Sequence, residues 1–466
     1  MCASDLVRRI GTVTATAIVV SNMMGTGIFT TTGFLAGDLG SPFLVLSIWL
    51  VGGAIALAGA LSYVELALNF PRSGGEYVYL SEAWGPAWGF IDGWVSFFAG
   101  FAAPIAAATL AISAYLGLSD TGFAVEAGPL TVHLAPAQLT ACAIVIVFTA
   151  LNFLGAQVVG RLQNMLTAFK LAVVAGFLLL GFVIGSGDAA NFTQHAERTS
   201  TLPLFEQLAV SLVFVLFAYS GWNAAVYVAE EVKDPERTFP VALAAGTTLV
   251  IILYFALNIL FVYGASLEQL KGVIAVGAEV AGSLFGAGMA RWFSLAMAFS
   301  LLATVNAMCL VGPRVYYAMA QNRAFFPMAA RIHPRWKSPW IAVLMQGCAS
   351  VLLIVLPTFR GLVVYIGFTL YLFTALSVLA LFKFRRRPDW KRFVWLDRTY
   401  PSIPILYVLM SVWILVFSIK GAPLPSAFAL LTVFGGALVY HVYVSRQPPS
   451  RLGDKISPSN GSDGEA

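Results

Sequence analysis

Apolar runs separated by short polar segments make up most of the chain. Each run reaches or approaches the ~20 residues that cross a bilayer as a helix, so the pattern predicts twelve transmembrane helices. Because the hydrocarbon core holds no water, each span must be helical to pair its own backbone groups. The predicted spans lie near residues 11–36, 43–69, 85–117, 137–155, 159–185, 204–230, 238–264, 287–321, 339–357, 361–383, 403–420 and 424–445.

Composition excludes a soluble protein of 466 residues. Hydrophobic residues make up 59% and charged residues 11%, and the mean hydropathy is +0.83. So few charges cannot cover the surface of soluble domains, where roughly 25% is usual. We therefore expect an all-α polytopic membrane protein.

The positions of Lys and Arg predict the orientation. If the N-terminus is cytoplasmic and twelve spans alternate, 21 of the 27 Lys and Arg residues fall on the cytoplasmic side. This is the positive-inside bias, and one missed span would destroy it.

The net charge of +5 comes with no basic stripe, so nucleic acid is not an expected partner. The cluster at Lys383, Arg385, Arg386, Arg387, Lys391 and Arg392 is interpreted as topogenic charge, with anionic lipid headgroups as the alternative ligand.

The predicted organisation has five parts. They are a cytoplasmic N-terminus (1–10), spans 1–5 as a first repeat (11–185), spans 6–10 as a second repeat (204–383), spans 11–12 (403–445) and a disordered cytoplasmic tail (446–466).

Two spans are interrupted near their middle by polar residues and glycine. The first interruption reads Ser21-Asn22-Met23-Met24-Gly25-Thr26-Gly27-Ile28-Phe29, and the second reads Phe217-Ala218-Tyr219-Ser220-Gly221-Trp222-Asn223. They occupy the first position of each set of five spans, as expected for a 5+5 inverted repeat with broken helices 1 and 6. Glycines that merely allow close helix packing are the alternative interpretation.

Broken helices favour a particular ligand. A helix that restarts inside the membrane presents free N–H groups, which attract a carboxylate, and one that stops there presents free carbonyls, which accept from an ammonium. Two breaks side by side therefore suit a zwitterionic α-amino acid, and Gly25 and Gly27 allow the ligand to approach the backbone.

These motifs resemble those of the amino acid–polyamine–organocation (APC) superfamily, and most closely its L-type amino acid transporter group with its bacterial homologues. Further matches are Glu230 to Arg237, Pro71-Arg72-Ser73-Gly74-Gly75-Glu76-Tyr77, and Gly312 to Ala320. The resemblance covers about residues 10–385 and implies the LeuT-like fold. It also implies a substrate site, with the carboxylate on the amides of Thr26 and Gly27, the ammonium on the carbonyls of Met23, Phe217, Ala218 and Ser220, Phe217 as a gate, and a side-chain pocket shaped by Gly221, Trp222 and Asn223.

Lys170 is the one basic residue predicted to lie deep within a span. It follows Arg161 by nine residues, or ~13.5 Å along a helix, which is too deep for easy contact with the interface. The resemblance implies that its ammonium replaces sodium between the broken first helix and span eight. This predicts sodium-independent transport, and a titrating Lys170 in a proton-coupled symporter is the alternative.

Other charged and polar residues receive plainer interpretations. Glu65 and Asp92 are predicted to pair with nearby basic loops, with a proton relay as the alternative. Asn306 either lines the translocation path or forms a hydrogen bond to a neighbouring helix. No acidic residue lies beside either break in the sequence, so a cationic substrate has no evident counter-ion.

The absent motifs narrow the function. There is no metal cluster, cofactor motif, Walker motif or nucleophile elbow, so neither catalysis nor ATP-driven pumping is predicted. The loop from Ser119 to Gln138 lacks the cysteine by which eukaryotic L-type members hold an accessory glycoprotein, so no disulfide-linked subunit is expected.

We predict a cell-membrane transporter of neutral L-amino acids, acting as exchanger or facilitator. A cationic amino acid or polyamine permease is the alternative, and a channel is disfavoured by the paired breaks.

Overall fold

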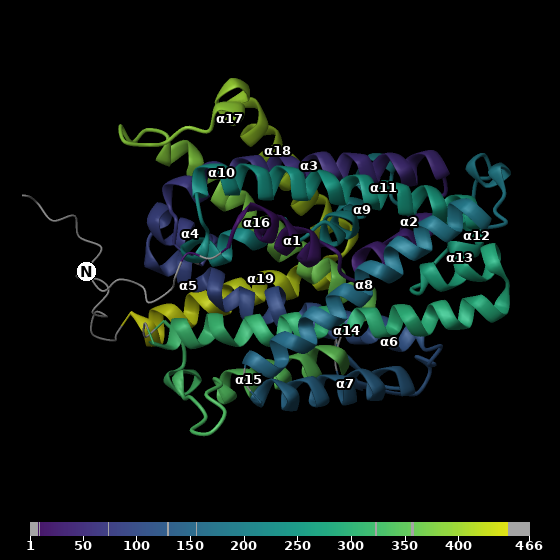
Figure 1. The fold of residues 1–466 in the computed structure, drawn as a ribbon, viewed down its shortest axis with the longest axis horizontal. Coiled ribbons are helices and arrows are strands. Elements are labelled where there is room, and N and C mark those ends of the chain that lie inside the picture. The colour runs from purple at the N-terminus through teal and green to yellow at the C-terminus, as the bar shows by residue number, and fades with distance from the viewer. Residues whose placement is uncertain are drawn as a thin grey trace, which may run out of the picture.

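A bundle of long helices, which run roughly along one direction, makes up the protein (Figure 1). The structure is a computed structural model that describes residues 8, 10–72, 74–127, 130–154, 156–321, 324–355 and 358–445. Within these residues, nine single helices are long and apolar enough to cross a membrane, and a bent helix pair makes a tenth. The predicted tail at 446–466 and residues 1–7 and 9 of the N-terminus lie outside the described residues.

The long apolar segments agree closely with the predicted spans. They are α1 (Thr12–Met23) with α2 (Gly27–Leu39), α3 (Pro42–Asn69), α5 (Pro86–Val95) with η1 (Ser96–Ala102) and α6 (Ala103–Tyr115), α7 (Pro136–Phe153), α8 (Ala156–Ile184), α9 (Leu204–Ala218), α10 (Pro235–Pro240) with η4 (Val241–Ala245) and α11 (Gly246–Gly264), α14 (Ala287–Gln321), α15 (Trp340–Val355), α16 (Phe359–Phe384), α18 (Ser402–Gly421) and α19 (Pro423–Val439) with η6 (Tyr440–Val444). Helices α9 and α15 are apolar but shorter than 18 residues. The count of twelve spans and the inverted repeat therefore stay predictions.

Short helices lie between the long ones. They are α4 (Glu76–Trp84), η2 (Ala189–Phe192), η3 (Ala224–Glu231), α12 (Leu267–Leu270), α13 (Val276–Phe285), η5 (Pro327–Ala330) and α17 (Val394–Thr399). The prediction of an all-α fold is confirmed except in one loop, where β1 (Phe123–Ala127) and β2 (Leu130–Leu134) form an antiparallel hairpin with Phe123 opposite Leu134. This hairpin was not predicted, although Leu130–Leu134 alternates apolar and polar residues, because the alternation covers only five residues.

Burial separates the interior helices from those that face the surroundings. Every residue of α2 is buried, and 78% of the most apolar window of α16 is buried. The corresponding figure for α19 with η6 is 11%, although this segment is only slightly less apolar than α16. Since an apolar surface stays exposed only where lipid covers it, α19 lies at the rim and α2 in the centre.

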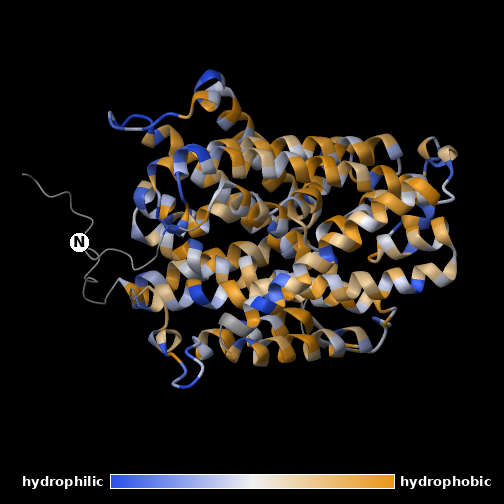
Figure 2. Ribbon diagram, in the orientation of Figure 1, coloured by the Kyte–Doolittle hydropathy of each residue, from blue (hydrophilic) through white to orange (hydrophobic). Residues whose placement is uncertain are grey.

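Hydrophilic residues gather at the ends of the bundle, whereas the long helices are mostly hydrophobic (Figure 2). The end that holds α4, α10 and α17 carries most of the Lys and Arg residues and is called the basic end below. There the predicted pairing of Glu65 is confirmed, since its Oε1 and Oε2 accept from Arg385 Nε and Nη2 at 2.7 and 2.6 Å. The pair joins the end of α3 to the end of α16.

Candidate functional site

The first break separates α1 from α2. The two helices are bent by 41°, and Met24, Gly25 and Thr26 lie between them. The Gly25 amide donates to the Met23 carbonyl at 2.7 Å, which turns the chain out of the helix. Within the described residues the amides of Thr26 and Gly27 donate to no acceptor, as expected at the start of a helix. The predicted interruption of the first span is therefore confirmed.

The second break follows α9, which ends at Ala218. The chain turns through Tyr219 to Asn223 and continues as the 3-10 helix η3. Gly221 has a φ of +99°, a conformation that only glycine adopts readily. The predicted interruption of the sixth span is confirmed as well.

The two breaks pack directly against each other. A Cβ atom added to Gly27 would lie 2.4 Å from the Cα of Ala218, and one added to Gly221 would lie 2.9 Å from the carbonyl carbon of Asn22. Each break thus uses a glycine to approach the backbone of the other. A small cavity of ≈ 10 Å³ remains beside them, lined by Ser220, Gly221, Trp222, Asn223, Leu370, Tyr371 and Thr374. This is about the room for one water molecule, so this arrangement is closed to an amino acid.

Tyr254 of α11 joins the two breaks. Its hydroxyl lies 2.6 Å from the Met23 carbonyl oxygen and 3.2 Å from that of Ala218, and its ring is fully buried. Sequence analysis missed this residue. The available signal was a hydroxyl in the middle of an apolar run, because a buried tyrosine O–H has to find an acceptor.

Three of the four carbonyls predicted to hold an ammonium, those of Met23, Phe217 and Ala218, already accept hydrogen bonds from the protein. Met23 O accepts from the Gly25 amide and the Tyr254 hydroxyl, and Phe217 O accepts from the amide and hydroxyl of Ser220 at 3.1 and 2.7 Å. Since a carbonyl oxygen has two lone pairs, both are occupied in each case. A substrate ammonium would have to replace one of these donors.

Lys170 of α8 reaches the end of α1. Its ammonium donates to the carbonyl of Met24 at 2.7 Å and to that of Ser21 at 3.3 Å, and the side chain is 2% exposed. These are last-turn carbonyls, which carry the negative end of the helix dipole. The expected contact with the broken first helix is thus present.

The link from α8 to α14, the predicted span eight, is made by other residues. Asn306 Nδ2 donates to Gln163 Oε1 at 2.8 Å, and Gln163 Nε2 donates to Thr167 Oγ1 at 3.0 Å. Gln163, Thr167 and Lys170 are spaced so that they lie along one side of α8. Within the described residues, therefore, Lys170 does not itself bond α14, and Asn306 acts as a bond between helices.

A buried carboxylate lies at the second break, which corrects the sequence analysis. Asn223 Nδ2 donates to Glu76 Oε1 at 2.5 Å, and the Tyr63 and Tyr227 hydroxyls donate to Oε1 and Oε2 at 2.9 and 2.7 Å. Glu76 is 5% exposed. The expectation of no acidic group beside a break was wrong, because the chain folds α4 back against the bundle 147 residues before Asn223.

Asp92 of α5 also differs from its prediction. It is 7% exposed, and within the described residues no Lys or Arg pairs with it. Instead its carboxyl interacts electrostatically with Glu76 and lies near the Tyr227 hydroxyl. The predicted pairing of Asp92 with a basic loop was wrong because α5 turns this side chain inward, towards α4.

Trp222 and Phe217 are both buried at the second break. The Trp222 ring packs edge-on against Tyr63 at 4.8 Å between centroids and also lines the small cavity, so it contributes to packing and to the pocket wall. Phe217 lies in the last turn of α9 and is 7% exposed. Its role as a gate stays a prediction.

An ion pair closes the bundle at the end away from the basic end. Arg360 Nη2 lies 2.6 Å from Asp38 Oδ2, joining the first turn of α16 to the end of α2. The same guanidinium lies over the rings of Phe214 and Phe34, at 5.0 and 5.6 Å from their centroids. One side chain thus ties α16 to α2 and α9, the helices that flank both breaks.

The sequence of the whole bundle matches one family. The amino acid permease family model covers residues 10–439. The chain belongs to this family. The fold, with its two interrupted helices, is consistent with the LeuT-like fold expected for the APC superfamily.

Individual members of the permease family are similar over nearly the full chain. The human large neutral amino acids transporter small subunit 2 is 30% identical over 450 residues, which cover 95% of this chain and 82% of the human protein. The mouse b(0,+)-type amino acid transporter 1 is 28% identical over 95% of this chain and 89% of its own length. The serine/threonine exchanger SteT of Bacillus subtilis is 28% identical over 94% and 97%, respectively.

Proposed function

We propose that this permease is a sodium-independent transporter that exchanges neutral L-amino acids across the cell membrane by alternating access. The observation that carries the proposal is the meeting of two broken helices in the interior. We assign the substrate carboxylate to the amides of Thr26 and Gly27, which donate to no acceptor within the described residues. We assign the ammonium to the carbonyls of Met23, Phe217, Ala218 and Ser220, where it would replace donors from the protein. Transport of this kind requires no covalent chemistry, so the protein is not an enzyme.

The side-chain pocket lies at the second break. Gly221, Trp222 and Asn223 line the small cavity there, with Phe217 one turn before them as the gate and Gly25 at the first break. Because the cavity holds about one water molecule, the breaks must separate to admit a substrate. The names of the relatives refer to large neutral amino acids and to serine and threonine, which supports a neutral substrate.

Lys170 supports independence from sodium. Its ammonium already donates to two carbonyls at the end of α1, where a coupling cation would otherwise be needed.

We further propose that both termini are cytoplasmic, at the basic end. No cysteine lies between Ser119 and Gln138, so the chain works without a disulfide-linked subunit.

The test is uptake of labelled leucine and serine by the purified chain in proteoliposomes. Uptake should require unlabelled amino acid inside the vesicles and should not change when choline replaces sodium. Vesicles without protein give the background. Uptake that rises steeply with a sodium gradient, or that appears only with a copurified subunit, would contradict the proposal.

Proton-coupled symport is a second candidate that one observation favours. Glu76 and Asp92 are buried close together, and the partners of Glu76 are the neutral side chains of Tyr63, Asn223 and Tyr227. Carboxyls inside a membrane bundle commonly mark proton relays, and Glu76 lies beside the second break. Uptake into empty vesicles driven by an inward pH gradient, and abolished in Asp92→Asn, would select this candidate over exchange.

A further inference from the structure

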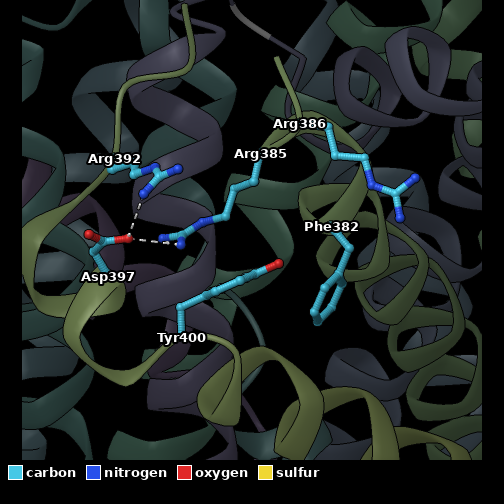
Figure 3. A pocket seen from close by; sticks show the side chains of 6 residues that line it. All are labelled: Phe382, Arg385, Arg386, Arg392, Asp397 and Tyr400. Atoms are coloured by element: carbon cyan, nitrogen blue, oxygen red, sulfur yellow. Dashed lines mark hydrogen bonds and ion pairs between the residues drawn. The ribbon is translucent and has the colours of Figure 1, made fainter. Parts of the chain in front are cut away.

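A second cavity lies at the basic end, away from both breaks. It has a volume of ≈ 510 Å³ and is lined by Phe382, Arg385, Arg386, Arg392, Asp397 and Tyr400 (Figure 3). These residues come from the end of α16, from the segment that follows it, from α17 and from the residue two before α18. Three of the six side chains are guanidinium groups, so the cavity attracts anions.

One of the three arginines is fixed as part of the wall. Arg385 donates to both oxygens of Glu65 and, through Nη1, to Asp397 Oδ1 at 3.0 Å. Its guanidinium also lies 3.8 Å from the centre of the Tyr400 ring. The charge of Arg385 is therefore compensated by Glu65 and Asp397. In turn, its guanidinium neutralises these two carboxylates, which would otherwise repel an anion.

The other two arginines have donors to spare. Arg392 touches Asp397 only at 3.8 Å, and its side chain is 60% exposed. Arg386 is exposed and pairs with no carboxylate in the described part of the chain. In Figure 3, Arg392 points towards Asp397 and Arg386 lies on the opposite side, beyond Phe382. Guanidinium groups bind phosphate oxygens in pairs of parallel hydrogen bonds, which makes phosphate the fitting anion.

The position of the cavity indicates where that phosphate comes from. Helix α17 stands out from the side of the bundle (Figure 1), and its Val394 and Trp395 are 59% and 73% exposed. Helix α18 begins two residues after Tyr400 and at once presents exposed Ile405 and Leu406. Tryptophan prefers the membrane–water interface, and exposed aliphatic residues mark the hydrocarbon. The cavity therefore lies at the level of the lipid headgroups.

We propose that this cavity binds the phosphate group of an anionic phospholipid. Arg386 and Arg392 contact the phosphate, Arg385 and Tyr400 form the fixed wall, and Trp395 packs beside the glycerol and upper acyl chain. The lipid enters sideways from the bilayer, past α17.

The experiment measures retention of phosphatidylglycerol by the purified full chain, using native mass spectrometry with phosphatidylcholine as the neutral competitor. The variant Arg386→Gln/Arg392→Gln should bind phosphatidylglycerol roughly 10- to 30-fold more weakly, since each arginine near a membrane surface contributes about one factor of five. The matched control is Arg331→Gln/Arg335→Gln, which removes two exposed arginines outside the cavity and should retain the lipid like the unmodified protein.

Two outcomes would overturn the proposal. One is equal retention of phosphatidylglycerol by the cavity variant and the control, which would mean that the basic end attracts lipid through its overall charge. The other is complete displacement of the lipid by millimolar inorganic phosphate, which would assign the cavity to a soluble anion. Unchanged thermal unfolding of the double variant shows that it is folded. If it does not fold, the single variant Arg392→Gln replaces it in the experiment, and its affinity for phosphatidylglycerol is expected to fall about fivefold.

Discussion

At the scale of single residues, the closest approach between the breaks depends on Gly27. A methyl group there would lie 2.4 Å from Ala218 Cα, which is backbone and cannot move aside. We predict that Gly27→Ala abolishes exchange and lowers the free energy of unfolding by about 1–3 kcal/mol, the usual cost of overpacking. Vesicle uptake and thermal unfolding measure the two effects.

Gly176→Ala is the matched control for Gly27→Ala. Nothing lies within 4 Å of the added methyl group, and Gly176 belongs to α8. Uptake by this control should equal that of the unmodified protein. Normal exchange by Gly27→Ala would show that the breaks do not pass through this close contact during transport.

Lys170 gives a second residue-scale prediction. In Lys170→Ala the carbonyls of Ser21 and Met24 lose their buried donor, so we expect exchange to fall at least tenfold. The control is Met165→Ala on the same helix, because Met165 is 70% exposed. Initial rates of leucine uptake check both variants, and full activity of Lys170→Ala would remove the basis for sodium independence.

Residues whose chemistry shows in the sequence could be predicted, whereas their partners could not. Gly25, Gly27 and Gly221 interrupt apolar runs, and Lys170 is a charged residue deep within one. Each could therefore be predicted as a site residue from the sequence alone. Glu76 and Tyr254 became significant only through tertiary packing, which brings them to residues 147 and 231 positions away. Periodicity contains no information on such distant pairs.

At the scale of elements, α16 links neighbouring helices at the end of the bundle opposite the basic end. Its Arg360 pairs with buried Asp38 of α2 and covers the rings of Phe34 and Phe214. We predict that Arg360→Gln loosens this end, so that peptides covering residues 30–40 exchange amide hydrogen at least severalfold faster. Hydrogen–deuterium exchange with mass spectrometry measures the rate.

Lys420→Gln is the control for Arg360→Gln. It also breaks an ion pair, that of Lys420 with Glu206 at 2.6 Å, but this pair joins α18 to α9 and its lysine is 59% exposed. Exposed pairs contribute little. If both variants changed the exchange of residues 30–40 equally, the Asp38–Arg360 pair would have no special part in closing this end.

The lengths of the long helices could be predicted from the sequence, and so could the two breaks. Hydropathy sets the length of a spanning helix, and the predicted 287–321 agrees with α14 at both ends. The short α17 and the β1–β2 hairpin were not predicted, because segments of five or six residues are held by their neighbours rather than by their own pattern.

At the scale of the whole molecule, the bias of Lys and Arg towards one end predicts the orientation. A green fluorescent protein fused after Ala466 should fluoresce, and alkaline phosphatase fused at the same place should be inactive, because both report a cytoplasmic end. Phosphatase fused within the outer loop at Thr193 gives the opposite control. An active phosphatase after Ala466 would contradict the predicted cytoplasmic C-terminus.

Tyr254 has one consequence for the transport cycle as a whole. Its hydroxyl carries a single hydrogen, and two carbonyls on different broken helices compete for it. The Met23 oxygen also accepts from the Gly25 amide, so when the helices part and the hydroxyl stays with Met23, the Ala218 oxygen is left without a donor unless the cargo brings its own N–H. An unladen carrier that leaves a buried acceptor unpaired bears a cost of about 1–3 kcal/mol, which slows its return by roughly 5- to 150-fold. A hydroxyl hydrogen shared between the two breaks therefore favours return of the carrier with a bound molecule, which supports the proposed exchange.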